Sequence, residues 1–201
     1  MRNAEATKER ILEAALAEFS AHGIAGARVD RIAQGAKCNK NLIYIYFEDK
    51  ETLFETVLGK HLLRVHEEYP FTPDDLPGYA AKVFDFAMTN PDLMRLVAWS
   101  TLENTKGSAE RAATLDGKLT ALTEAQKNGQ VGTAFAPDFL LVAILSLATA
   151  WSVASPFGPP IKGMAKGAER TAALRKSVTE AVQLLANTGT AARIAGKSKS
   201  R

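Results

Sequence analysis

Apolar residues recur in the first fifty positions with the spacing of short amphipathic helices. The first stripe ends at His22 and Gly23 and consists of Ile11, Leu12, Ala15, Leu16 and Phe19. A second, shorter stripe runs from Val29 to Ala36, and a third holds Ile43 and Phe47. Because only three residues separate the second stripe from the third helix, the sequence predicts two short helices joined by a tight turn. Asn39 lies where an N-cap residue of the last helix would lie.

Further helical stripes fill the rest of the chain. A long helix is predicted from about Lys50, and three prolines at positions 70, 73 and 77 then form a connector. One later helix is predicted to end near Asn90, and the next is predicted to start at Asn90–Pro91. A further helix runs from about 109 to 128, another starts at Ala136–Pro137, and the last spans 174–185. No segment has the alternation of a strand, so the expected fold class is all-α, with about nine helices.

The pattern also predicts the domain organisation. Residues 1–52 are expected to form a three-helix, helix-turn-helix domain, and residues 53–189 a larger helical domain. Residues 190–201 are expected to be a disordered basic tail, because they are rich in Ser, Gly and Lys.

Composition restricts the classes of protein and site. The chain has 201 residues, 46% of them hydrophobic, and a single cysteine, Cys38, so an intrachain disulfide is excluded and the cytoplasm is the expected location. The three histidines have no metal-ligand spacing, and no phosphate loop, nucleophile elbow or carboxylate pair is present. We therefore expect no metal, no cofactor and no catalysis. The uncharged run 139–161 is interrupted by prolines and serines, which favours a buried helix over a membrane span.

Net charge by itself says little about DNA. The chain carries +3, but the tail beyond Gly189 contributes four cations and no acid. Locally the balance differs: between Gly26 and Phe47 there are four basic residues and one acid, Asp30. The positive charge is therefore concentrated on the two helices that would approach a duplex.

The third helix carries side chains suited to nucleic acid. Its apolar face needs only Ile43 and Phe47, which leaves Asn39, Lys40, Asn41, Tyr44 and Tyr46. Asn can pair with adenine edges, Lys can reach guanine or phosphate, and tyrosine hydroxyls bond to phosphate oxygens. The alternative is a solvated helix face with snorkelling side chains.

The order of these residues resembles a known family. From Thr7 to Leu53 the chain reads TKERILEAALAEFSAHG, then VDRIAQGA, then NKNLIYIYFEDKETLF, and it resembles the amino-terminal domain of the tetracycline-repressor (TetR) family of transcriptional regulators. The resemblance implies a dimer that binds a partly palindromic operator, usually as a ligand-relieved repressor. It further implies that Lys40, Asn41 and Tyr44 face DNA, that Tyr46 and Lys50 grip phosphates, and that Ala27 or Arg28 begins the second helix at the backbone.

Three positions depart from the family pattern. Lys37 stands in the turn where glycine is frequent, and it would be strained if the backbone there needs a positive φ. Ala27 stands where threonine commonly begins the second helix, and Ile45 replaces a frequently polar or aromatic residue. These departures affect the expected operator sequence and affinity rather than the fold.

The carboxy-terminal region suggests a dimer surface. Its last helix has a seven-residue rhythm, and the helix from Asp138 to Ala154 is apolar nearly all round. We expect a four-helix interface, two helices from each subunit, that includes Ala143, Ala150, Leu174, Val178, Ala181 and Leu185. A monomeric core is the alternative.

The same region holds the candidates for a ligand pocket. They are bulky and apolar, and core packing is the favoured explanation for each of them: Phe84, Met88, Met94, Trp99, Leu119, Leu122, Phe139 and Trp151. Few charged residues look buried in this region, so the expected small-molecule effector is mostly apolar. Arg95 and Glu103 are the nearest candidates for polar anchors.

The sequence thus predicts a homodimeric, ligand-responsive regulator that binds a double-stranded DNA operator, acts as a repressor and has no membrane partner. The alternatives are an activator or a regulator controlled by a partner protein. A more distant alternative is a small-molecule carrier or enzyme on the same fold.

Overall fold

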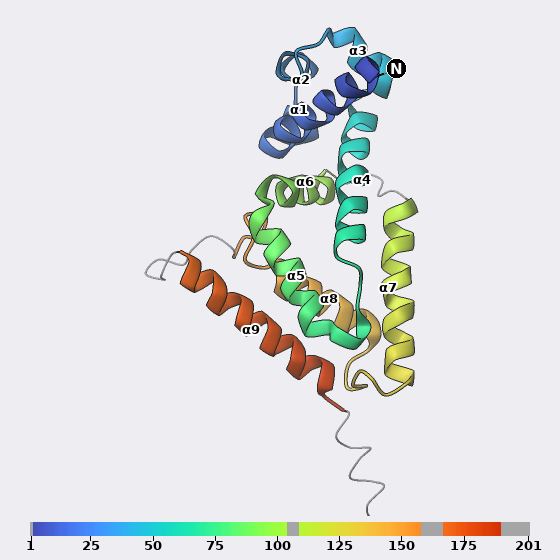
Figure 1. The fold of residues 1–201 in the computed structure, drawn as a ribbon, viewed down its shortest axis with the longest axis vertical. Coiled ribbons are helices and arrows are strands. Elements are labelled where there is room, and N and C mark those ends of the chain that lie inside the picture. Colours follow the sequence, from blue (N-terminus) through green and yellow to red (C-terminus); the bar gives the residue numbers. More distant parts are fainter. Residues whose placement is uncertain (1, 104–108, 158–166, 190–201) are drawn as a thin grey trace, which may run out of the picture. The chain divides into compact units, whose positions relative to one another are not determined.

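The computed structural model describes residues 2–103, 109–157 and 167–189, and in these residues all regular structure is helical. Nine α-helices and one 3₁₀ helix follow one another along the chain (Figure 1). They are α1 (Arg2–Gly26), α2 (Val29–Gly35), α3 (Lys40–Phe47), α4 (Lys50–Glu68), η1 (Pro73–Asp75), α5 (Leu76–Thr89), α6 (Pro91–Leu102), α7 (Ala109–Lys127), α8 (Pro137–Thr149) and α9 (Ala168–Asn187). The predicted all-α class is confirmed.

The chain forms two compact units. The first contains residues 1–67 and 90–108, and the second contains residues 68–89 and 109–201. Helix α6 therefore belongs to the same unit as α1–α4, although α5 precedes it in the chain. The sequence boundary at residue 52 does not anticipate this return. The expected basic tail, 190–201, lies outside the described residues.

The first unit is built on the apolar stripe of α1. Ile11, Ala15 and Phe19 are completely buried, and the Phe19 ring meets the Phe54 ring of α4 edge-on, with 5.2 Å between centroids. Helices α2 and α3 bury Ile32 and Ile43 in the same unit. The hydrophobic spacing seen in the sequence thus becomes one shared core, which fixes the helix-turn-helix on α1.

Local chemistry sets the boundaries of the short helices. Asn39 caps α3, because its side-chain oxygen accepts a hydrogen bond of 2.9 Å from the backbone N–H of Asn41. Asp49 performs the same task for α4 by accepting from the N–H of Thr52 at 2.6 Å. In the turn between α2 and α3, Lys37 has a φ of 52°. This is the left-handed conformation that glycine adopts without strain and that lysine adopts at a cost. Glu48 also has a positive φ, of 63°, directly after α3.

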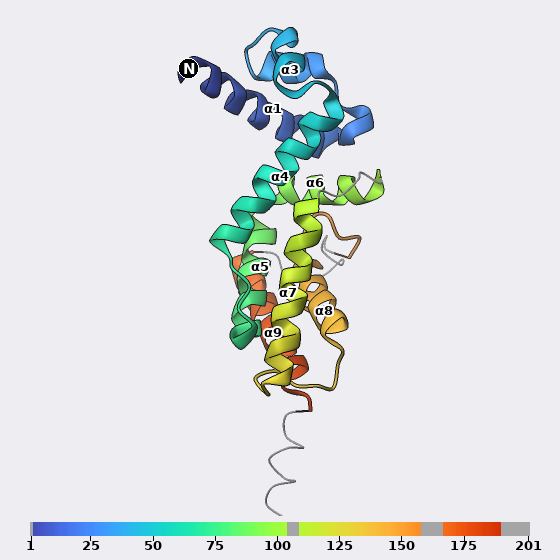
Figure 2. The same ribbon diagram turned by 90° about the vertical axis from the view of Figure 1, so that its right-hand side faces the viewer.

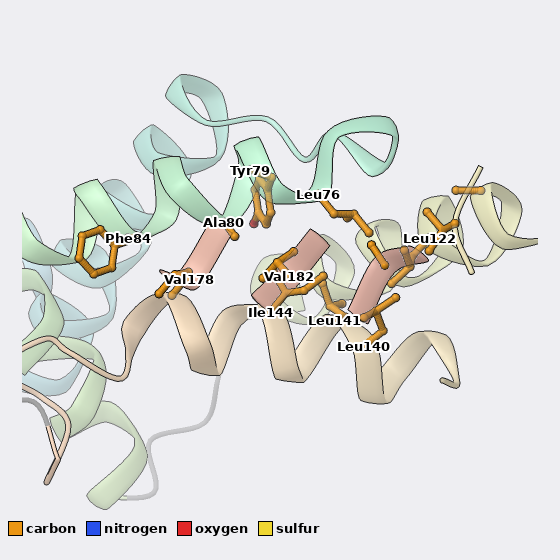
Figure 3. Close-up of a cluster of buried hydrophobic side chains, with 14 residues drawn as sticks. Leu76, Tyr79, Ala80, Phe84, Leu122, Leu140, Leu141, Ile144, Val178 and Val182 are labelled. Atoms are coloured by element: carbon orange, nitrogen blue, oxygen red, sulfur yellow. The ribbon is translucent and has the colours of Figure 1, made fainter. Parts of the chain in front are cut away.

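The second unit packs α5 against α8 and α9, with α7 along α8 (Figures 1 and 2). Figure 3 shows the core where these helices meet: Phe84 and Ala80 of α5, Leu140 and Ile144 of α8, and Val182 of α9 are all completely buried. The loop from α7 to α8 is tied down by Gln126, whose amide donates to the carbonyls of Gly132 and Phe135 at 2.7 and 2.9 Å.

Within the described ranges, no helix combines the length and the apolar character that a membrane span requires.

Candidate nucleic-acid interface

Helix α3 divides its side chains between a buried and an exposed face. Ile43 and Phe47 retain 1% and 2% of their accessible surface, as the apolar stripe requires. Asn41, Tyr44 and Ile45 are exposed, the last two by 44% and 72%. The exposed surfaces of Tyr44 and Ile45 are not used in the core of this unit, so they are available to a partner.

Lys40, the first residue of α3, is held by an acid on α2. Its ammonium lies 2.9 Å from Oδ1 of Asp30, and the side chains of Lys40 and Asp30 are 43% and 74% exposed. The hydrogen bond to Asp30 raises the pKa of Lys40, which favours the charged ammonium. Asp30 is a neighbour that the sequence pattern did not bring forward, and it competes with DNA for this cation.

The side chains of Tyr46 and Lys50, both predicted to contact phosphates, lie against the first unit rather than out in solvent. The Tyr46 ring is half-buried with its centroid 6.2 Å from that of Phe47. The Lys50 ammonium donates to the carbonyl of Ala27 at 3.4 Å. Both side chains are thus partly fixed before any phosphate arrives, which lowers the entropy cost of a contact.

Asn39 has a structural task of its own. Its side-chain oxygen is used in capping α3, so only the amide group remains for a base or a phosphate.

The entry into α2 is held by Glu18 of α1. This carboxylate accepts from the backbone N–H of Arg28 at 2.9 Å and from Nε of Arg31 at 2.8 Å. Burial raises the pKa of Glu18, but the hydrogen bonds from Arg31 and Arg28 and the charges of Arg31 and His22 lower it more, so the pKa lies below its ordinary value. Arg28 occupies the N-cap position of α2 in extended conformation. Glu18 therefore binds the N–H of the N-cap residue itself, and α2 has no side-chain cap hydrogen bond.

The eight candidate ligand residues are divided between the two units. Phe84 and Leu122 are fully buried in the core of the second unit, and Met88, Leu119 and Trp151 pack against that core. Phe139 is 55% exposed and stacks on Phe135. Met94 and Trp99 belong to α6 of the first unit, where the Trp99 indole donates to the carbonyl of Ser20 at 3.3 Å.

Both expected polar anchors have partners within the chain. Arg95 pairs with Asp92 at 3.1 Å on the same helix, and both oxygens of Glu103 accept hydrogen bonds from the backbone of α1. Binding of an effector by these two side chains stays a prediction.

The candidate dimer residues on α8 and α9 differ in burial. Val178 retains 3% of its surface and belongs to the core of its own chain, so its side chain is not free for a partner. The remaining candidates are half-buried: Ala143, Ala150, Leu174, Ala181 and Leu185. Next to them lie apolar side chains that the sequence reading did not assign to the interface, Val142 and Leu184, which are 62% and 72% exposed.

Comparisons with known proteins agree along the chain. Residues 11–57 match the model of the family described as bacterial regulatory proteins, tetR family, and residues 75–183 match the model of the tetracyclin repressor-like C-terminal domain. The transcriptional repressor SCO4008 of Streptomyces coelicolor is 43% identical over 162 residues, which are 77% of this chain and 82% of that protein. The repressor NicS of Pseudomonas putida is 30% identical over 49% of this chain and 50% of its own length.

Solved structures show the same fold. The regulator SCO4942 of Streptomyces coelicolor superposes with a TM-score of 0.76 at 36% identity, over 88% of this chain and 96% of that one. The structure of AibR with isovaleryl coenzyme A and operator DNA has a TM-score of 0.66 over 88% of this chain and 97% of its own, at 14% identity.

Proposed function

Because this chain belongs to the TetR family of helix-turn-helix transcriptional regulators, whose members similar to it are named repressors, we propose that it represses transcription as a homodimer on a palindromic operator and is released by a small, mostly apolar ligand. The proposed place of action is the cytoplasm, where the operator DNA is.

One observation carries the proposed reading of DNA: α3 exposes Asn41, Tyr44 and Ile45 while its apolar face is buried in the helix-turn-helix core. An α-helix fits the major groove of B-DNA, which is about 12 Å wide. In this arrangement Lys40, Asn41 and Tyr44 contact base edges or phosphates, and the apolar Ile45 is suited to a thymine methyl group. Arg28, Tyr46 and Lys50 bind the flanking phosphates, and the amide of Asn39 adds a further donor.

Exposed apolar side chains on α8 and α9 support the homodimer. Val142 and Leu184, with the half-buried Ala143 and Ala181, offer a surface whose apolar character a second copy of the chain would bury. A twofold pair places two α3 helices about 34 Å apart, or at a multiple of that distance, and so reads two half-sites at once. The symmetry of the operator follows from the symmetry of the protein.

The proposal for the effector rests on the second unit. Met88, Leu119 and Trp151 line the edge of its core and are apolar, so a ligand bound among them has an apolar body. Release requires that the ligand prefer the conformation in which the two α3 helices do not match the operator spacing.

The test starts from DNA selected out of random sequence by the purified chain. Its symmetry reports dimerisation, and its half-site spacing reports the distance between the two α3 helices. Tyr44→Ala combined with Lys40→Ala is expected to abolish binding of the selected fragment, with the melting temperature unchanged. Lys127→Ala is the matched control, because Lys127 is an exposed, ion-paired lysine in the second unit. If the double variant binds as the control does, the proposed interface is wrong.

A further inference from the structure

The end of α6 is fastened to the end of α1 by one carboxylate. Oε1 of Glu103 accepts a hydrogen bond of 2.9 Å from the N–H of Ile24, and Oε2 accepts one of 3.1 Å from the N–H of Ala25. The two helices lie in the same unit (Figure 1). Seventy-eight or more residues of chain separate the partners, so this contact is tertiary and not part of either helix.

The backbone of α1 is shaped to receive this carboxylate. Gly23 has a φ of 67° and a ψ of −177°, which breaks α1 and turns the following N–H groups toward α6. A Cβ at Gly23 would collide with Oε1 of Glu103 and would come within 2.9 Å of the Trp99 ring. Trp99 adds its own bond to the carbonyl of Ser20, at 3.3 Å. The site therefore needs a glycine for its conformation and for its close approach.

The segment held in this way leads directly into the helix-turn-helix. The N–H of Ala27 returns to the carbonyl of Gly23 at 3.2 Å, the carbonyl of Ala27 accepts from Lys50, and the N–H of Arg28 is held by Glu18. Residues 23–28, here called the α1–α2 linker, are thus held by side chains from α1, α4 and α6. Their conformation sets the start of α2, and α2 packs on α3.

We propose that Glu103 is a positioning residue for operator recognition: it fixes the α1–α2 linker and so holds α2 and α3 in the conformation that fits DNA. This role rests on the proposed DNA interface, and it gives the end of α6 an indirect part in DNA binding, without any contact to DNA.

For Glu103→Gln, electrostatic repulsion and positioning predict opposite changes in the affinity for DNA. An acid in a DNA-binding unit repels phosphate, so removing its charge alone would tighten DNA binding. Glu103→Gln keeps the size of the side chain but turns an NH₂ group toward one of the two backbone donors, so one hydrogen bond is lost. Since a hydrogen bond to a charged group shifts a two-state equilibrium roughly tenfold or more, Glu103→Gln lowers the fraction of chains in the competent linker conformation, and the apparent operator affinity falls in proportion to that fraction.

Asp92→Asn is the matched control. Asp92 lies on α6, carries the same charge and pairs with the exposed Arg95 instead of with α1. Operator and non-operator duplexes are titrated with the wild-type full chain and with both variants at one salt concentration. We expect Glu103→Gln to bind the operator more weakly, by up to about tenfold, whereas its binding to non-operator DNA and the behaviour of Asp92→Asn stay at or slightly above the wild-type level.

A spectroscopic readout reports the linker itself. Amide hydrogen exchange at Ile24 and Ala25 is expected to be about tenfold faster in Glu103→Gln, while that of buried core amides is unchanged. The chain has two tryptophans, so the indole N–H resonance of Trp99 is readily assigned and is expected to shift. Trp99→Phe removes the bond to Ser20 and part of the ring that lies against Gly23. It serves as a second variant if Glu103→Gln unfolds, and it is expected to weaken operator binding in the same direction.

The proposal is overturned if Glu103→Gln binds the operator as tightly as Asp92→Asn, or if Trp99→Phe does so where Glu103→Gln does not fold. A wild-type chain that binds no DNA would instead overturn the proposed function itself.

Discussion

The salt dependence of operator binding tests the proposed interface quantitatively. Three basic side chains on each subunit, Arg28, Lys40 and Lys50, are assigned to DNA, which gives six on a twofold dimer. Each phosphate that is neutralised releases counterions, so the logarithm of the affinity should fall with the logarithm of the salt concentration with a slope of about −5. Between 50 and 200 mM salt this amounts to a loss of about 10³-fold.

Replacing Lys40 by alanine removes two of these charges from the dimer. The slope should become shallower by about 2, so that wild type and variant differ about tenfold more at 50 mM than at 200 mM salt. The ion pair with Asp30 is exposed on both sides, so losing it costs the folded state little. Asp30→Asn provides the opposite perturbation: it frees the ammonium from its competitor and should strengthen binding to any duplex at low salt.

Fluorescence anisotropy of a labelled operator, titrated at four salt concentrations, gives these slopes directly. Lys127→Ala, in the second unit, should keep the wild-type slope, and Tyr44→Ala should lower the affinity with the slope unchanged, because its phenol carries no charge. A Lys40→Ala line parallel to the wild-type line would show that Lys40 does not neutralise phosphate and would refute its assignment.

Further substitutions test the other parts of the reasoning. Leu184→Glu puts a charge on an exposed apolar position of α9. It should give monomers in sedimentation velocity and weaken operator binding; an intact dimer would contradict the assignment. Glu18→Gln should lower the free energy of unfolding by about 1 kcal/mol in urea titrations at pH 7, because a partly buried charged acceptor is lost. Since the pKa of Glu18 is lowered by folding, its contribution is present above the ordinary value of 4.5 and disappears as the pH falls below it; an equal loss from the substitution at pH 3 would contradict this. Lys37→Gly should be neutral or stabilising by up to about 1 kcal/mol, whereas Lys37→Val should destabilise, because only glycine adopts a φ of 52° without cost.

The parts of the fold that the sequence predicted are those set by local periodicity. The stripe of Ile11, Ala15 and Phe19 became the buried face of α1, and Ile43 and Phe47 became that of α3, because side chains three and four positions apart share a helix face whatever the rest of the chain does. Asn39 was recognised as a cap for the same reason, since the group it binds is two residues away.

Long-range pairing lay beyond this reasoning. Leu174, Val178, Ala181 and Leu185 all fit one helical rhythm, but only the position of α5 and α8 decides that Val178 turns into its own core while Leu184, outside the rhythm, is exposed. The return of α6 to the first unit depends on Glu103 and on the break at Gly23, which are 80 positions apart, and no periodicity connects them. The sequence did show that His22 and Gly23 end the first stripe, and that ending is the point where α6 attaches.

Acids within the first unit show how DNA binding and folding are reconciled. Every carboxylate there opposes phosphate, yet Glu18 and Glu103 both bind backbone N–H groups of residues 24–28, the stretch that leads into α2. A neutral acceptor such as glutamine satisfies these donors less well, because a carboxylate accepts at both oxygens and forms the stronger, charge-assisted bonds. The repulsion is long-range and screened by salt, whereas the hydrogen bonds are short and partly buried. On the proposed role of Glu103, the positional gain exceeds the electrostatic loss at physiological salt, so acids in this unit are compatible with the proposed DNA binding.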